Sequence, residues 1–114
     1  MPMQLIVATI TKKHLAELAK ERFGDLVKVV VDVKQKIMVI GGELHSDEEG
    51  FLLNQGSSQE NLWGINLYPD SLEADFIEFD SMINLRPSHG NRSCDVLDVN
   101  IRNEIIKIVN QLVR

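Results

Sequence analysis

Apolar residues recur at helical spacing near both ends of the chain. The first set follows Thr11, whose side chain can cap a helix by accepting a backbone N–H, and Gly24 supplies a left-handed stop. The second set follows Asp98 and Asn100, either of which can cap a final helix. The two predicted buried stripes are Leu15, Leu18, Ala19 and Phe23, and then Ile101, Ile105, Ile108, Val109 and Leu112.

The stretch DLVKVVVDVKQKIMVIGG is apolar at both strand parities, and it predicts two strands that meet at KQK. One parity contains Val29, Val31, Val33, Ile37 and Val39, and the other contains Val30, Met38 and Ile40. A strand that is apolar on both sides is covered on both sides. We therefore expect helices on one face, and a dimer partner is one candidate for the other. LIVATI, near the start, predicts an edge strand or a packed N-terminal arm.

The segment SDEE predicts a short helix after this hairpin. Ser46 and Glu49 form a capping-box pattern, and Gly56 ends the helix. The negative charges of Asp47, Glu48 and Glu49 are typical of a first helical turn, where they complement the helix dipole. SSQE repeats the capping pattern, but only a turn fits before the next strand.

A second hairpin is predicted over LWGINLYPDSLEADFIEFDSMINLR, with its turn at Pro69 and Asp70. If Tyr68 pairs with Phe76, then Asn66 faces Glu78 and Gly64 faces Asp80. The polar surface expected from this register consists of Asn66, Glu78, Asp80, Asn84 and Arg86.

The predicted element order is β-α-β-β-α-β-β-α, within a single domain of residues 1–114 that has no internal linker. Consecutive hairpins favour an α+β fold with a mainly antiparallel sheet and helices packed mostly on one face.

Composition limits the class of partner. The formal net charge of −5 argues against a protein that coats nucleic acid or anionic membrane, because both need broad positive potential. QLIVATI is too short for a membrane span, and MPMQ lacks the basic start of a signal peptide. The lone Cys94 cannot form an internal disulfide, so we expect a reducing, cytoplasmic location.

The loop NLRPSHGNRS carries the first candidate site. Arginine forks suit phosphate or carboxylate, and Gly90 permits a turn whose backbone N–H groups can bind an anion. The predicted ligand-binding residues are Arg86, His89, Gly90, Asn91, Arg92 and Ser93, with Asn66 and Tyr68 contacting the rest of the ligand. The alternative is structural: these residue types suit any strand-to-helix connection, and Arg86 can pair with Glu78 or Asp80.

The segment GGELH carries the second candidate site. Glu43 and His45 follow a strand end two residues apart, and a histidine beside a carboxylate is the minimum for acid–base catalysis. Together with Glu78 and Asp80 they offer nitrogen and oxygen atoms to a divalent metal. Paired-histidine metal spacing is absent, so no metal ligand is assigned.

Three segments together resemble the domain-of-unknown-function 5674 family of small bacterial and archaeal proteins. They are ERFGDLVKVVVDVKQKIMVIGGELHSDEE, LWGINLYPD and IEFDSMINLRPSHGNRS, and the likeness runs from the first predicted helix to IRNEIIKIVNQLV. The resemblance implies a free-standing, single-domain prokaryotic protein. It implies no activity, cofactor or catalytic residue.

Three functions follow as hypotheses. The first is the binding, or hydrolysis, of a phosphorylated or anionic small molecule at the loop that runs from Arg86 to Ser93. The second is a non-enzymatic interaction protein, a homodimer formed through the first hairpin. The third is a metal-dependent hydrolase or a small ribonuclease. Residue types alone decide neither whether the protein is an enzyme nor which cofactor it uses.

Overall fold

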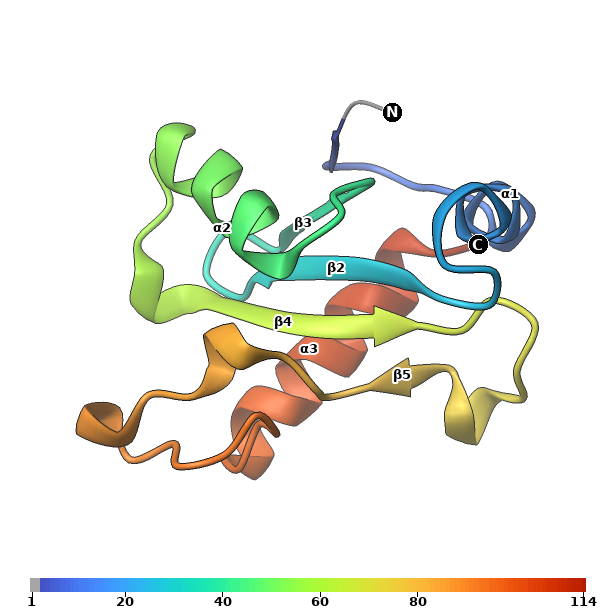
Figure 1. Ribbon diagram of the computed structural model, residues 1–114. Coiled ribbons are helices and arrows are strands. Elements are labelled where there is room, and N and C mark those ends of the chain that lie inside the picture. The colour runs from blue at the N-terminus through green and yellow to red at the C-terminus, as the bar shows by residue number, and fades with distance from the viewer. Residues whose placement is uncertain (1–2) are drawn as a thin grey trace.

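Five strands form one antiparallel sheet in the computed structural model, which describes residues 3–114 (Figure 1). Their order across the sheet is β1-β3-β2-β4-β5. The strands are β1 (Gln4–Ile6), β2 (Val27–Asp32), β3 (Ile37–Ile40), β4 (Leu62–Leu67) and β5 (Ile77–Glu78). The helices are α1 (Lys12–Arg22), α2 (His45–Asn54) and α3 (Val99–Leu112). The predicted α+β class is confirmed; of the stretch MPMQ, Met1 and Pro2 lie outside the described residues.

Two of the helices begin where their caps predict. Thr11 Oγ1 accepts a hydrogen bond from the His14 N–H at 3.0 Å, and the Asp98 carboxylate accepts from the first turn of α3. The capping box predicted for α2 is wrong. This helix begins at His45, so Ser46 lies inside its first turn, and no side chain among the described residues caps it.

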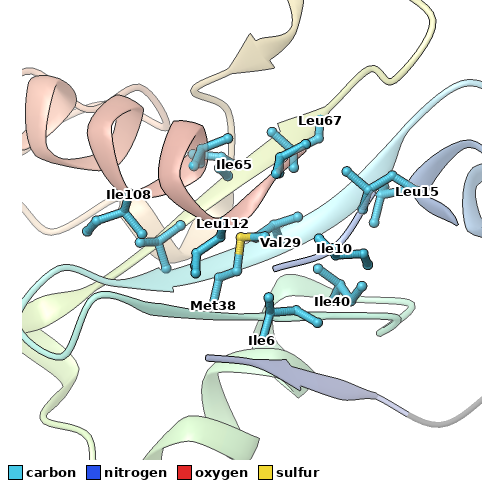
Figure 2. Close-up of a cluster of buried hydrophobic side chains, with 14 of the residues drawn as sticks. Ile6, Ile10, Leu15, Val29, Met38, Ile40, Ile65, Leu67, Ile108 and Leu112 are labelled. Atoms are coloured by element: carbon cyan, nitrogen blue, oxygen red, sulfur yellow. The ribbon is translucent and has the colours of Figure 1, made fainter. Parts of the chain in front are cut away.

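The helices cover both faces of the sheet. Figure 1 shows α2 on one side and α3 on the other. The larger core joins α1 and α3 to the sheet, and Figure 2 shows Leu15, Ile108 and Leu112 meeting sheet side chains there. The smaller core lies under α2 and is built on Val30, Val39, Leu52 and Leu62.

The face assignment of the first hairpin needs correction. Val31 pairs with Met38 and Val29 pairs with Ile40, so all four side chains share the larger core. The chain turns over four residues, 33–36, which brings odd positions of β2 opposite even positions of β3. Val30, Met38 and Ile40 are fully buried within one chain. The feature that suggested a dimer partner is therefore accounted for inside the fold.

The register of the second hairpin is confirmed at its turn. Asn66 pairs with Glu78, and the Tyr68 N–H donates to the Phe76 carbonyl at 2.9 Å. The extension of this strand to Arg86 is wrong, because β5 ends at Glu78, and residues 79–98 contain short 3₁₀ turns and one isolated bridge between Arg86 and Asn91.

A side chain replaces the missing strand pairing. Asn84 is fully buried, and its Oδ1 accepts from the Gly64 N–H at 2.8 Å while its Nδ2 donates to the Gly64 carbonyl at 2.9 Å. Nδ2 also donates to the Cys94 carbonyl at 2.9 Å. The amide of Asn84 thus makes the two bonds that a neighbouring strand residue would otherwise make with β4. This competition from a side chain that is distant in the sequence ends the ladder.

Gly64 leaves the space that this arrangement needs. A Cβ built at Gly64 lies 2.5 Å from Ser81 Cβ and overlaps Ser81 Oγ. We expect Gly64→Ala to lower the free energy of unfolding by about 1–3 kcal/mol in urea denaturation, because the overlap forces backbone shifts. Gly50→Ala is the matched control, since a Cβ there meets nothing within 4 Å and lies inside α2. The control should be stabilising by about 0.5–1 kcal/mol; equal effects of the two changes would contradict the prediction.

The C-terminal end of the chain lies against the segment that precedes α1, beside that helix (Figure 1). Ile10 and Val113 form a parallel bridge, flanked by three backbone hydrogen bonds between residues 10–12 and 112–114. Within residues 3–114, none of the helices is both long and apolar enough to cross a membrane.

Candidate functional site

A row of polar side chains crosses three strands on the face that α2 covers. Lys28 of β2 pairs with Asn66 of β4, and Asn66 pairs with Glu78 of β5. In the next row along, Val30 pairs with Gly64, and Val30 belongs to the smaller core. The polar row therefore begins where the apolar cover of α2 ends, and the first residue of α2, His45, lies at that boundary.

His45 is buried and held by the backbone. Its Nε2 lies 2.7 Å from the Ile65 carbonyl oxygen. A carbonyl oxygen only accepts, so the neutral ring carries its proton on Nε2 and keeps a lone pair on Nδ1. Burial lowers the pKa of His45 below its ordinary value, and the charge of Lys28 adds to this, while the Ile65 carbonyl, Asp80 and Asn66 oppose it. His45 is thus an uncharged base near neutral pH, with acceptors in place for the charged form.

Asn66 connects this histidine to the edge of the sheet. Its Nδ2 donates to Glu78 Oε1 at 2.9 Å and to the Asp80 carbonyl at 3.3 Å. Tyr68 donates to the same Glu78 oxygen at 3.0 Å, and burial together with Glu78 raises the pKa of Tyr68. Because both Nδ2 partners are acceptors, the orientation of the Asn66 amide is fixed. Asn66 Oδ1 is buried without a hydrogen-bond partner in residues 3–114 and favours the charged form of the nearby His45.

These residues line a hollow of about 400 Å³, here called the His45 pocket. Its polar lining consists of Lys28, His45, Ser46, Asn66, Asp80 and Ser81, and the exposed Leu44 and Met82 lie at its rim. The backbone N–H groups of His45 and Ser46 have no acceptor in the described chain, since the bonds of this helix end begin at Asp47. A helix N-terminus with unpaired N–H groups carries partial positive charge.

Glu48 lies behind the pocket, one turn further along α2. Its side chain is fully buried; Oε2 accepts from the Gly42 N–H at 3.0 Å, and Oε1 has no partner in the described residues. Burial raises the pKa of Glu48 well above its ordinary value, against the opposing effects of the Gly42 N–H and the Lys28 charge. Lys28 therefore supplies positive charge to both His45 and Glu48.

Glu43 does not join His45. The exposed Glu43 carboxylate forms an ion pair with Arg22 of α1 at 2.7 Å and lines a different hollow of about 600 Å³. The chain between them enters α2, which turns the two side chains to different sides. The proposed metal group is likewise not assembled: no set of three or more His, Cys, Asp or Glu residues in 3–114 is arranged to hold a metal ion.

The loop residues gather at a second hollow of about 450 Å³, here called the Arg86 pocket. Arg86, His89, Gly90 and Asn91 line it, together with Glu60, Trp63, Leu97, Asp98 and Ile101. Arg86 pairs neither with Glu78 nor with Asp80. Its Nη2 lies 3.8 Å from Glu49 Oε2 of α2, and its guanidinium lies over the Trp63 ring at 4.6 Å.

Several predicted ligand-binding residues in this loop have structural contacts. Asn91 is buried, and its Nδ2 donates to the carbonyls of Asn84, Ser93 and Asp95. Ser93 Oγ accepts from the Asp95 N–H at 3.0 Å, and Gly90 takes the left-handed conformation with φ of 82°. Arg92 is exposed and does not line the Arg86 pocket. The loop geometry is thus explained largely by its own hydrogen bonds.

Two charged residues of the His45 pocket region were missed from the sequence. Lys28 interrupts the run VKVVV, and Glu48 resembles an ordinary first-turn glutamate. The signal for Lys28 lies in the pairing of β2 with β4, which are not neighbours in the sequence. The signal for Glu48 lies in Gly42, because a Cβ there would lie 2.6 Å from Glu48 Cγ.

The family model described as "Protein of unknown function (DUF5674)" matches residues 4–112. No curated protein and no solved structure matches the chain. The matched range includes every residue of both pockets. The chain therefore belongs to the DUF5674 family, in agreement with the resemblance of its sequence segments.

Proposed function

We propose that this protein binds a small anionic ligand in the His45 pocket, where His45 accepts a hydrogen bond or a proton from the ligand. The observation that carries the proposal is the convergence of three features on one hollow: the Lys28 side chain, whose ammonium also lies 5.3 Å from the centre of the Phe23 ring, the unpaired N–H groups at the start of α2, and the uncharged His45 ring. The first two attract an anion, and the third supplies a base.

The charge distribution favours a small ligand with few charges. Asp80 lines the same pocket, and Glu78 lies one strand further along the polar row. A polyanion would place charge near these carboxylates, while a single phosphate or carboxylate reaches Lys28 and the helix end alone. The net charge of −5 likewise disfavours a ligand with many negative charges.

The base role of His45 rests on its second nitrogen. Nε2–H is bound to the Ile65 carbonyl, so Nδ1 accepts. A hydroxyl or amine on the ligand would donate to Nδ1, and Asn66 Oδ1 and Asp80 would stabilise the imidazolium once the proton has moved. If the ligand reacts, this proton transfer is the step the pocket supports.

We expect Lys28→Met to raise the dissociation constant for inorganic phosphate or glycerol phosphate about 10–100-fold, since one charge-assisted hydrogen bond is lost. Isothermal titration calorimetry measures the change. Lys107→Met, at an exposed position of α3, is the control that removes the same charge elsewhere and should leave the constant within about twofold. Equal losses in both variants would assign the effect to overall charge and reject the pocket.

Arg92→Ala separates this proposal from binding at the loop, because Arg92 is exposed and does not line the His45 pocket. Phosphate affinity that falls with Arg92→Ala and not with Lys28→Met would favour the loop. The hypothesis of a homodimeric interaction protein is tested directly by sedimentation velocity, which measures whether the chain is a monomer or a dimer.

We also propose a prokaryotic cytoplasm as the setting, supported by the lone Cys94 and by the organisms of the family that the segments resemble.

A further inference from the structure

We propose that the Arg86 pocket is a second ligand site, independent of the His45 pocket, that takes a monocarboxylate with an apolar body. The pocket combines one fixed guanidinium with apolar walls and with acidic residues at its edge. Each of these three features restricts the ligand in a different way.

The guanidinium is fixed by the protein and leaves one nitrogen for a ligand. Nε donates to the Ile83 carbonyl at 3.1 Å and Nη2 donates to the Leu62 carbonyl. Nη1 donates to no acceptor in residues 3–114. It is also not one of the buried side-chain atoms without a partner, so it is accessible from outside the protein. Since the Arg86 side chain is only 11% exposed and lines this pocket, Nη1 is the guanidinium nitrogen left for a ligand oxygen.

The charge of Arg86 is only partly balanced. Glu49 Oε2 stays 3.8 Å away, and this oxygen is buried without a hydrogen-bond donor in the described chain. The Trp63 ring and the two carbonyls hold the guanidinium in place before any ligand arrives. A cation that is already ordered binds an anion without a further loss of side-chain entropy.

The walls favour an apolar ligand body. Trp63, Leu97 and Ile101 line the pocket, and Leu97 is 51% exposed in the unliganded chain. Leu97 is kept there by its backbone, because the Leu97 N–H donates to the buried Asn91 Oδ1 at 3.0 Å. An exposed leucine beside an aromatic ring gains stability when an apolar group covers it.

The edge of the pocket limits the ligand's charge. Glu60 and Asp98 also line it, and the Asp98 carboxylate already accepts the first N–H groups of α3. A nucleotide, a polyphosphate or an RNA backbone would bring several negative charges against these carboxylates for one available guanidinium nitrogen. A ligand with a single carboxylate is repelled less by Glu60 and Asp98 than a ligand with several negative charges.

Trp63 is the only tryptophan of the chain, so its fluorescence reports on this pocket. We expect saturable fluorescence changes on titration with hexanoate, at least tenfold weaker binding of its uncharged analogue hexanamide, and no saturable response to pyrophosphate. A response to pyrophosphate equal to that of hexanoate, or equal affinities for hexanoate and hexanamide, would overturn the proposal.

Surface variants test the site without disturbing Arg86, which holds backbone carbonyls. Leu97→Asp should weaken hexanoate binding at least fivefold, and Glu60→Gln should strengthen it about two- to fivefold. Both positions are exposed, and an unchanged urea midpoint verifies folding. Lys28→Met should leave hexanoate binding unchanged, which separates this site from the His45 pocket. Hexanoate binding that survives Leu97→Asp unchanged, or that is lost with Lys28→Met, would place the ligand elsewhere.

Discussion

Replacing Asn84 with alanine is expected to lower the free energy of unfolding by about 3–5 kcal/mol, the largest effect of any single substitution considered for this protein. The amide of Asn84 satisfies the N–H and the carbonyl of Gly64 and the carbonyl of Cys94, and the side chain is fully buried. Alanine would leave the Gly64 N–H and the Gly64 carbonyl without partners, away from water, while the Cys94 carbonyl keeps its hydrogen bond from the Ser81 N–H. Each unsatisfied buried group costs about 1–3 kcal/mol.

Urea denaturation followed by circular dichroism measures the cost. Asn103→Ala is the matched control, because Asn103 lies exposed on α3, where alanine is the better helix former. The control should be neutral or stabilising by up to about 0.7 kcal/mol. A cost below about 1 kcal/mol for Asn84→Ala would mean that water replaces the amide, and the account of the strand end would be wrong.

Replacing Glu48 with glutamine is expected to remove a strong pH dependence of stability. Burial places the folded-state pKa of Glu48 well above its unfolded value. The stability from the protonated carboxyl is therefore complete below the unfolded pKa and is lost as the pH rises through the folded pKa. In that interval the wild type should lose about 1.4 kcal/mol per pH unit from this one group. Glutamine keeps an oxygen for the Gly42 N–H and carries no proton to lose.

The difference in stability between the variant and the wild type isolates the effect of Glu48, because His45 is present in both proteins. This matters because His45 changes the stability with pH in the opposite direction. The folded pKa of His45 is lowered, so its contribution is present above its unfolded pKa and is lost as the pH falls through the folded value. Urea denaturation from pH 4.5 to 8 should show the Glu48→Gln advantage growing with pH. Glu104→Gln, exposed on α3, should follow the wild-type curve. Parallel curves for Glu48→Gln and the wild type would contradict the prediction.

The parts of the fold that local interactions determine could be predicted from the sequence. Thr11 and Asp98 cap their helices within three residues, and the pairing of Asn66 with Glu78 follows from the turn between them. The face assignment of the first hairpin was not determined in this way, because it depends on whether the turn has three or four residues. The end of β5 depends on the contact of Asn84 with Gly64, which lies 20 residues away.

The candidate site could be predicted only as residue types. His45 and Asn66 were selected by their chemistry, but they meet Lys28 only because β2 pairs with β4. These two strands are separated in the sequence by β3 and α2. Arg86 was selected as an anion-binding residue, but two of its three guanidinium nitrogens donate to backbone carbonyls, and the guanidinium lies over the Trp63 ring. The same fork geometry serves both purposes, so only tertiary contacts distinguish them.

The parallel bridge between Ile10 and Val113 also determines how the chain responds to mechanical force. If force is applied at Thr9 and Arg114, residues 10–12 and 112–114 slide past each other along their own axes. The three hydrogen bonds between these segments then bear the load together and do not open one at a time. The junction is therefore loaded in shear, so a pulling measurement between these two attachment points should report the simultaneous rupture of its three hydrogen bonds.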